Sequence, residues 1–188
     1  MRRASDGSLI RELVRETDGE ETGGARALVS PDEKLLVTRV GLSWPSLWDL
    51  ETGAAVLQPD LDPGSSREAL FSADGKLLVI AYEKSIDIWD MEDRRRLARN
   101  VPGLEHMEGG EARALALSPD GKRVAWAFRG ALLLWEIPTD EPKTAFTEDS
   151  SNVTSLCFSP SGARILVTLQ ARGAQLSLGP EEPRLLLK

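Results

Sequence analysis

The sequence is short of the residues from which most catalytic sites are built. Its 188 residues include one histidine, His106, and one cysteine, Cys157. A single cysteine excludes an intrachain disulfide framework, and a serine or cysteine nucleophile needs a base such as histidine beside it. We expect His106 to be a solvated loop residue and Cys157 to be a small buried side chain in a strand. The sequence therefore predicts a protein that is not an enzyme.

Ligands for metal ions and phosphate groups are also scarce. Asp60 and Asp62 have the spacing that begins some calcium-binding loops, but no glutamate follows at the position that closes such a loop. No cluster of cysteine and histidine could hold zinc, and no glycine-rich phosphate loop occurs. We therefore expect no cofactor and no metal ion.

Basic residues are outnumbered, and no long apolar run occurs. The 23 Lys and Arg against 30 Asp and Glu give a net charge of −7, which repels nucleic acid phosphates and anionic lipids. The most apolar stretch, Val124–Ile137, is interrupted by Arg129 and is too short to span a bilayer. The first residues include two arginines but no apolar segment after them, unlike a signal peptide. We expect a cytoplasmic protein with protein partners, and neither nucleic acid nor a membrane as a partner.

What the sequence does have is an internal repeat. Four segments resemble Ser-Pro-Asp-Gly-Lys and begin at Ser30, Ser72, Ser118 and Ser159, which are 42, 46 and 41 residues apart. In such a turn proline presets φ, aspartate accepts hydrogen bonds from nearby backbone N–H groups, and glycine accepts a positive φ. In the first copy Glu33 replaces the glycine, and a left-handed conformation there would cost about 1 kcal/mol.

A second marker keeps register with the first. Trp48, Trp89 and Trp135 lie 18, 17 and 17 residues after the serines of their repeats, and Leu176 takes this place in the fourth repeat. Two markers in register through several copies predict a repeat architecture. We expect these three tryptophans, and Trp126, to be buried in the core.

Each repeat resolves into four short strands separated by turn residues. In the third repeat we expect strands at 112–118, 123–128, 131–137 and 143–147. The two middle strands carry most of the apolar bulk, so one sheet alone cannot bury both faces. Stacking of successive sheets solves this problem, as in the blades of a β-propeller.

The Ser-Pro-Asp-Gly-Lys turns and the Leu/Ile-Trp-Asp strand ends, at a period near 42, resemble the WD-repeat family over residues 25–188. The resemblance implies an all-β fold of four-stranded antiparallel propeller blades and a non-catalytic scaffold for protein–protein interaction. The family's Gly-His dipeptide is absent. Glu83-Lys84 and Arg129-Gly130 occupy the turn in which the family has a buried aspartate. We therefore expect the family's hydrogen-bond network of His, Ser/Thr, Asp and Trp not to form.

The repeats divide the chain into an N-terminal strand and linker, 1–24, and four blades at 25–66, 67–111, 112–152 and 153–188. Four blades could form an open arc, as the C-terminal portion of a larger propeller or as half of a dimeric one, or they could form a closed four-bladed ring. We expect the open arc, with Ser8–Val14 capping the side of the first repeat. Open blade faces would then favour self-association.

Two places are candidates for binding a partner. Trp44 lies in a predicted turn where the other repeats have polar residues, and tryptophan is a common anchor in protein interfaces. Arg94, Arg95 and Arg96 are the one basic cluster and would suit an acidic partner; otherwise they form a solvated strand neutralised by the preceding acids. An alternative to the scaffold is the C-terminal sensor or regulatory portion of a larger signalling protein, a kinase or NTPase, whose catalytic part is absent.

Overall fold

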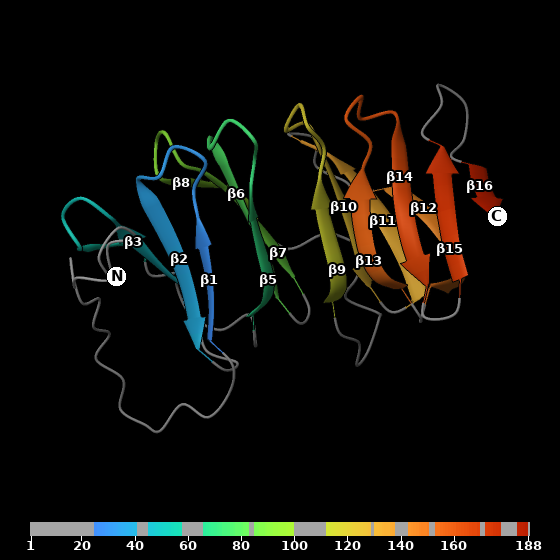
Figure 1. The fold of residues 1–188 in the computed structure, drawn as a ribbon, viewed down its shortest axis with the longest axis horizontal. Coiled ribbons are helices and arrows are strands. Elements are labelled where there is room, and N and C mark those ends of the chain that lie inside the picture. Colours follow the sequence, from blue (N-terminus) through green and yellow to red (C-terminus); the bar gives the residue numbers. More distant parts are fainter. Residues whose placement is uncertain are drawn as a thin grey trace, which may run out of the picture. The chain divides into compact units, whose positions relative to one another are not determined.

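The computed structural model describes residues 25–40, 45–57, 66–82, 85–99, 112–128, 130–137, 143–150, 153–169, 172–177 and 184–187. In these segments all regular structure is β-strand, arranged as four antiparallel sheets of four strands each (Figure 1). The predicted all-β fold of four-stranded blades is confirmed.

The described segments contain no helix with the length and hydropathy needed to cross a membrane.

The chain divides into two compact units, residues 1–61 and 62–188. The first unit holds one sheet, in the order β1 (Ala25–Val29), β2 (Leu35–Val40), β3 (Ser46–Asp49) and β4 (Ala55–Leu57). The second unit holds three sheets, whose strands also follow chain order. They are β5 (Ser66–Phe71), β6 (Leu77–Tyr82), β7 (Ile86–Asp90) and β8 (Arg95–Arg99); β9 (Ala112–Leu117), β10 (Arg123–Phe128), β11 (Gly130–Glu136) and β12 (Lys143–Ser150); and β13 (Val153–Phe158), β14 (Arg164–Leu169), β15 (Arg172–Ser177) and β16 (Arg184–Leu187).

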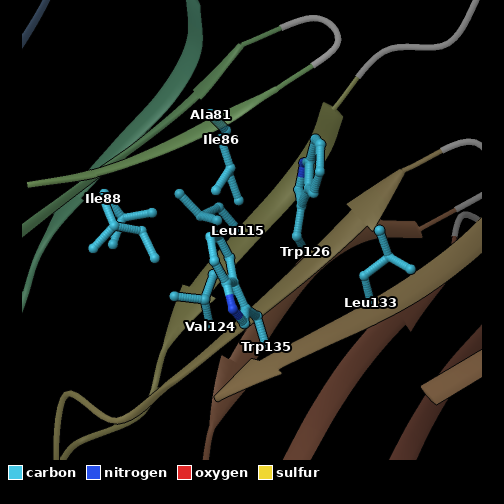
Figure 2. Close-up of a cluster of buried hydrophobic side chains, with 9 residues drawn as sticks. Ala81, Ile86, Ile88, Leu115, Val124, Trp126, Leu133 and Trp135 are labelled. Atoms are coloured by element: carbon cyan, nitrogen blue, oxygen red, sulfur yellow. The ribbon is translucent and has the colours of Figure 1, made fainter. Parts of the chain in front are cut away.

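Within the second unit, the sheets meet along their first strands and share two apolar cores. Strand β9 lies against β5 and against β13. The first core joins the second and third sheets (Figure 2), and its buried members are Val79, Ala81, Ile86, Ile88, Leu115, Val124, Trp126, Leu133 and Trp135. The second core joins the third and fourth sheets, with Ala114, Ala116, Ala125, Ala127, Leu132, Val153, Leu156, Ile165 and Val167. The third sheet is thus buried on both faces.

The repeated tryptophans occupy one register position, as the sequence predicts. Trp48, Trp89 and Trp135 each pair with the residue that lies six positions after the serine of their own repeat. Their exposed fractions are 6%, 7% and 5%, and that of Trp126 is 2%. All four are therefore core residues, as expected. Leu176 takes the same position in the fourth sheet, opposite Ile165.

The Ser-x-Asp turns have the conformation that their sequence predicts. In the third repeat the Ser118 hydroxyl donates to Asp120 Oδ1 at 2.5 Å and accepts the backbone N–H of Arg123 at 2.8 Å. The first two repeats have the same contacts. Gly75, Gly121 and Gly162 have φ near +70°, and Glu33 keeps this conformation at φ 59°. Glu33 therefore carries the steric cost that the three glycines avoid.

One expectation is wrong: Cys157 is exposed. Cys157 lies opposite Leu166 of β14, which is 48% exposed. Val79 and Ala125, which take the position of Leu166 in the second and third sheets, are buried in the shared cores. In the second and in the third sheet, the next sheet along the chain covers this face. In the fourth sheet, no described strand of the second unit covers it. Ser8–Val14 and His106 lie outside the described residues.

Candidate partner-binding surface

One contact of the hydrogen-bond network that the WD-repeat resemblance implies is present in the first sheet. Trp48 Nε1 donates to the hydroxyl of Thr38 at 2.7 Å. The complete network was not expected, and this one arm is more than the sequence analysis predicted. In the second sheet Ile80 stands eight residues after its serine, where the first sheet has Thr38. Trp89 Nε1 has no hydrogen-bond partner in the described part of the chain.

An arginine covers Trp89 instead. The Arg96 guanidinium lies over the Trp89 ring, with its carbon 5.5 Å from the ring centroid. Its Nη1 is 3.8 Å from Oδ2 of Asp87, whose side chain is fully buried. The positive charge of the Arg96 guanidinium is therefore attracted both to the face of the Trp89 ring and to the buried carboxylate of Asp87. Arg96, one of the three arginines predicted to contact a partner, is thus partly engaged in holding β8 against β7.

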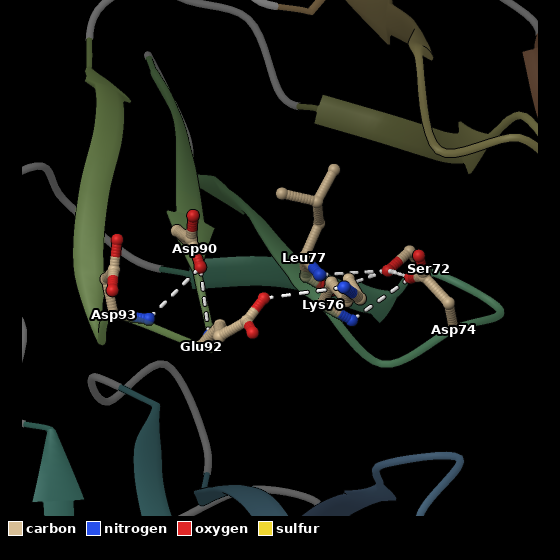
Figure 3. A network of polar contacts seen from close by, with 7 residues as sticks. All are labelled: Ser72, Asp74, Lys76, Leu77, Asp90, Glu92 and Asp93. Atoms are coloured by element: carbon tan, nitrogen blue, oxygen red, sulfur yellow. Dashed lines mark hydrogen bonds and ion pairs between the residues drawn. The ribbon is translucent and has the colours of Figure 1, made fainter.

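The turn between β7 and β8 is organised by the aspartate of the Trp-Asp pair. Asp90 Oδ1 accepts the backbone N–H groups of Glu92 at 2.9 Å and Asp93 at 3.2 Å (Figure 3). Glu92 in turn pairs with Lys76, which lies in the turn between β5 and β6, at 3.4 Å. The aspartate of the first repeat makes the same kind of turn. Sequence reasoning missed this role, although an aspartate two residues before a turn N–H is its usual signal.

Arg94 closes this turn in a conformation that favours glycine. Its φ is 52°, and the equivalent residue of the first sheet is Gly53, with φ 74°. A non-glycine residue in this region pays a steric cost because its Cβ approaches the backbone. The hairpin therefore presents the Arg94 side chain at some expense of stability.

The predicted contact residues are only partly brought together. Arg94 and Arg95 are adjacent and exposed, and Arg96 is half-buried beside them. Trp44 lies outside the described residues. The two exposed guanidiniums offer planar sets of N–H donors that suit carboxylates. Among the described residues, no group of three acidic, histidine or cysteine side chains is placed to hold a metal ion.

Comparison with known proteins agrees with the repeat pattern. The family model "WD domain, G-beta repeat" matches residues 140–169, which run from before β12 to the end of β14. An uncharacterized WD repeat-containing protein of Synechocystis sp. (strain ATCC 27184 / PCC 6803 / Kazusa) is 24% identical over 140 residues. The match covers 73% of this chain and 39% of that protein, so the chain spans about two fifths of the relative's length. The four blade-like sheets, the shared turn and tryptophan register, and these two matches together support a WD-repeat family for this chain.

Proposed function

We propose that the chain is a non-catalytic scaffold that binds other proteins. WD repeats generally mediate protein–protein interaction and are generally non-catalytic. The observation that carries the proposal is the exposed pair Arg94 and Arg95 on a hairpin that is fixed by internal hydrogen bonds. A rigid element that presents exposed arginines loses little conformational entropy when it binds.

The proposed contact residues are Trp44, Arg94, Arg95 and Arg96. Neither nucleic acid nor a membrane belongs to this proposal, because the net charge of −7 opposes both. A cytoplasmic location accompanies it, supported by the single cysteine in 188 residues.

Partner capture by wild-type protein and by Trp44→Ala tests the proposal. Crosslinked partners recovered from the source cells should fall several-fold with Trp44→Ala, while the melting temperature stays nearly unchanged. Trp135→Ala is the control for a core tryptophan and should lower the melting temperature strongly. A melting temperature lowered as much by Trp44→Ala would place Trp44 in the core, and unchanged capture would remove it from the interface.

We further propose self-association through an open blade face. Leu166 is 48% exposed on the uncovered face of the fourth sheet, beside the exposed Cys157. On a sizing column the reduced protein should elute ahead of a 20.5 kDa monomer, and Leu166→Lys should restore the monomer. Ala163→Lys, a change in an exposed turn of the same sheet, is the matched control. Elution of the wild type as a monomer would refute this proposal.

A second candidate function is a sensor or regulatory portion of a larger signalling protein, a kinase or NTPase. Its support is that the match covers only 39% of the Synechocystis relative. The gene sequence around the coding region tests it. A kinase or NTPase motif in the same reading frame would favour this function, and its absence would leave the scaffold.

A further inference from the structure

The second sheet ends in a strand that has a partner on one side only. Its order is β5-β6-β7-β8, so among the described strands β8 pairs with β7 and with no other. The sheets of the second unit meet along their first strands, β5, β9 and β13, so β8 lies at the opposite edge of its sheet. An edge strand presents backbone N–H and C=O groups to which another extended chain can bind.

The charge of β8 distinguishes it from the other three last strands. Strand β8 holds three arginines and no acid, and Arg94 directly precedes it, in a chain with a net charge of −7. Strand β4 has no charged residue, β12 has one lysine and two acids, and β16 has one arginine. A concentrated positive charge on an otherwise acidic protein favours an acidic occupant.

Two of the three acids that precede the arginines are engaged elsewhere. Asp90 accepts the backbone N–H groups of its turn, and Glu92 pairs with Lys76 (Figure 3). In the part of the chain that is described, neither Arg94 nor Arg95 has an ion-pair partner. The two guanidiniums are therefore available to carboxylates from outside.

The neighbouring residues hold this edge in place. Arg96 is bound over the Trp89 ring and beside Asp87, which fixes β8 in register with β7. Arg94 keeps a left-handed φ of 52° where the first sheet has a glycine. A strained residue that is kept in a well-ordered turn is a sign that its side chain has a use.

We propose that β8 is a docking edge, along which an extended acidic segment of a partner protein adds as a fifth strand of the second sheet. Main-chain hydrogen bonds to β8 supply affinity. Carboxylates on one face of the segment reach Arg95, and an acidic residue at the end of the segment reaches Arg94 in the turn before β8. This inference rests on the proposed scaffold function and names the chemistry of one partner.

The test uses a synthetic peptide of about eight residues that alternates glutamate and valine, the length of an ordinary strand. Titration into the full chain should show binding that weakens as salt is added. Hydrogen exchange of the backbone N–H groups at 95–99 should slow when the peptide is bound. The Arg94→Glu/Arg95→Glu variant should bind at least about tenfold more weakly, and should instead bind a lysine–valine peptide.

The matched control is Lys122→Glu/Arg164→Glu, which makes the same change of charge at two exposed residues away from β8. It should leave binding of the glutamate–valine peptide within about twofold. Equal weakening by this control, or equal binding of a glutamine–valine peptide, would overturn the proposal. So would equal binding of a single-stranded oligonucleotide or of a peptide with methylated backbone nitrogens.

Absence of peptide binding would also overturn the proposal that β8 is a docking edge. The arginines would then have the other role that charged residues have on edge strands, which is to prevent pairing with another chain. The scaffold function would stand or fall separately on whether the wild-type protein captures partner proteins. Thermal melting of the Arg94→Glu/Arg95→Glu variant checks that it is folded. If its melting temperature matches that of the wild type, a loss of peptide binding is due to the changed surface charge and not to unfolding.

Discussion

Two non-glycine residues among those described hold a left-handed backbone conformation, Glu33 with φ 59° and Arg94 with φ 52°. The other repeats fill the position of Glu33 with Gly75, Gly121 and Gly162. Both side chains are exposed, so no apolar burial offsets the steric cost. Other interactions of the turn therefore offset this steric cost, and in the first repeat they include the hydrogen bond from the Ser30 hydroxyl to Asp32.

At the residue scale, Glu33→Gly should raise the free energy of unfolding by up to about 1 kcal/mol, because glycine removes the Cβ clash at positive φ. Urea denaturation followed by tryptophan fluorescence measures this change. Gly75→Glu, the reverse change in the second repeat, should lower stability by a similar amount. A lower stability of Glu33→Gly would mean that the glutamate side chain makes a contact worth more than the strain.

At the element scale, each of the first three repeats is stabilised by an ionised aspartate in its first turn. In Asp120 the hydrogen bond from the Ser118 hydroxyl, and then that from the backbone N–H of Lys122, holds the pKa of the carboxyl below its usual value. The pKa values of Asp32 and Asp74 are lowered by equivalent contacts. The fourth repeat has Ser161 instead, whose hydroxyl lies 3.2 Å from that of Ser159.

Asp120→Asn should therefore destabilise the protein near neutral pH and much less in acid. A carboxyl whose folded pKa is depressed contributes stability above its unfolded pKa, about 3.9, and loses it as pH falls through the folded value. Urea unfolding across that range measures the difference between wild type and variant. Ser161→Asp should show the opposite sign, a gain at neutral pH that disappears in acid. The same loss for Asp120→Asn at every pH would contradict the role of the charge.

The repeat pattern predicted these elements because their signals are local. The Ser118-to-Asp120 turn and the position of Trp135 depend on residues close in sequence, and strand pairing then fixes their register. The place of Arg96 over Trp89 was not predicted, because it depends on the pairing of β7 with β8, in which Arg96 is opposite Trp89. A single sequence does not show this register.

The burial of Cys157 was predicted wrongly for a different reason. Alternation along β13 places Cys157 on the face opposite Leu156, but alternation does not say whether another sheet covers that face. In the second and third sheets the following sheet does so. Strand-level patterning thus defines the two faces of a blade, while the exposure of each face depends on its neighbours.

At the scale of the whole molecule, the second unit is held together by sheets that complete each other's cores. Ile86 and Ile88 of the second sheet are buried in one core with Val124 and Trp135 of the third (Figure 2). The third sheet then shares its other face with the fourth. Since neither face is buried by a sheet alone, these three sheets should unfold as one cooperative unit.

The most direct test of the account is the effect of Trp135→Ala on the neighbouring sheet. The central claim is that equivalent register positions build cores between successive blades. We expect the variant to lose about 3–5 kcal/mol in urea unfolding, as large-to-small core changes do. Hydrogen exchange should also quicken in β6 and β7, which do not contain the changed residue. A loss below about 1 kcal/mol, or faster exchange confined to β9–β12, would contradict the claim.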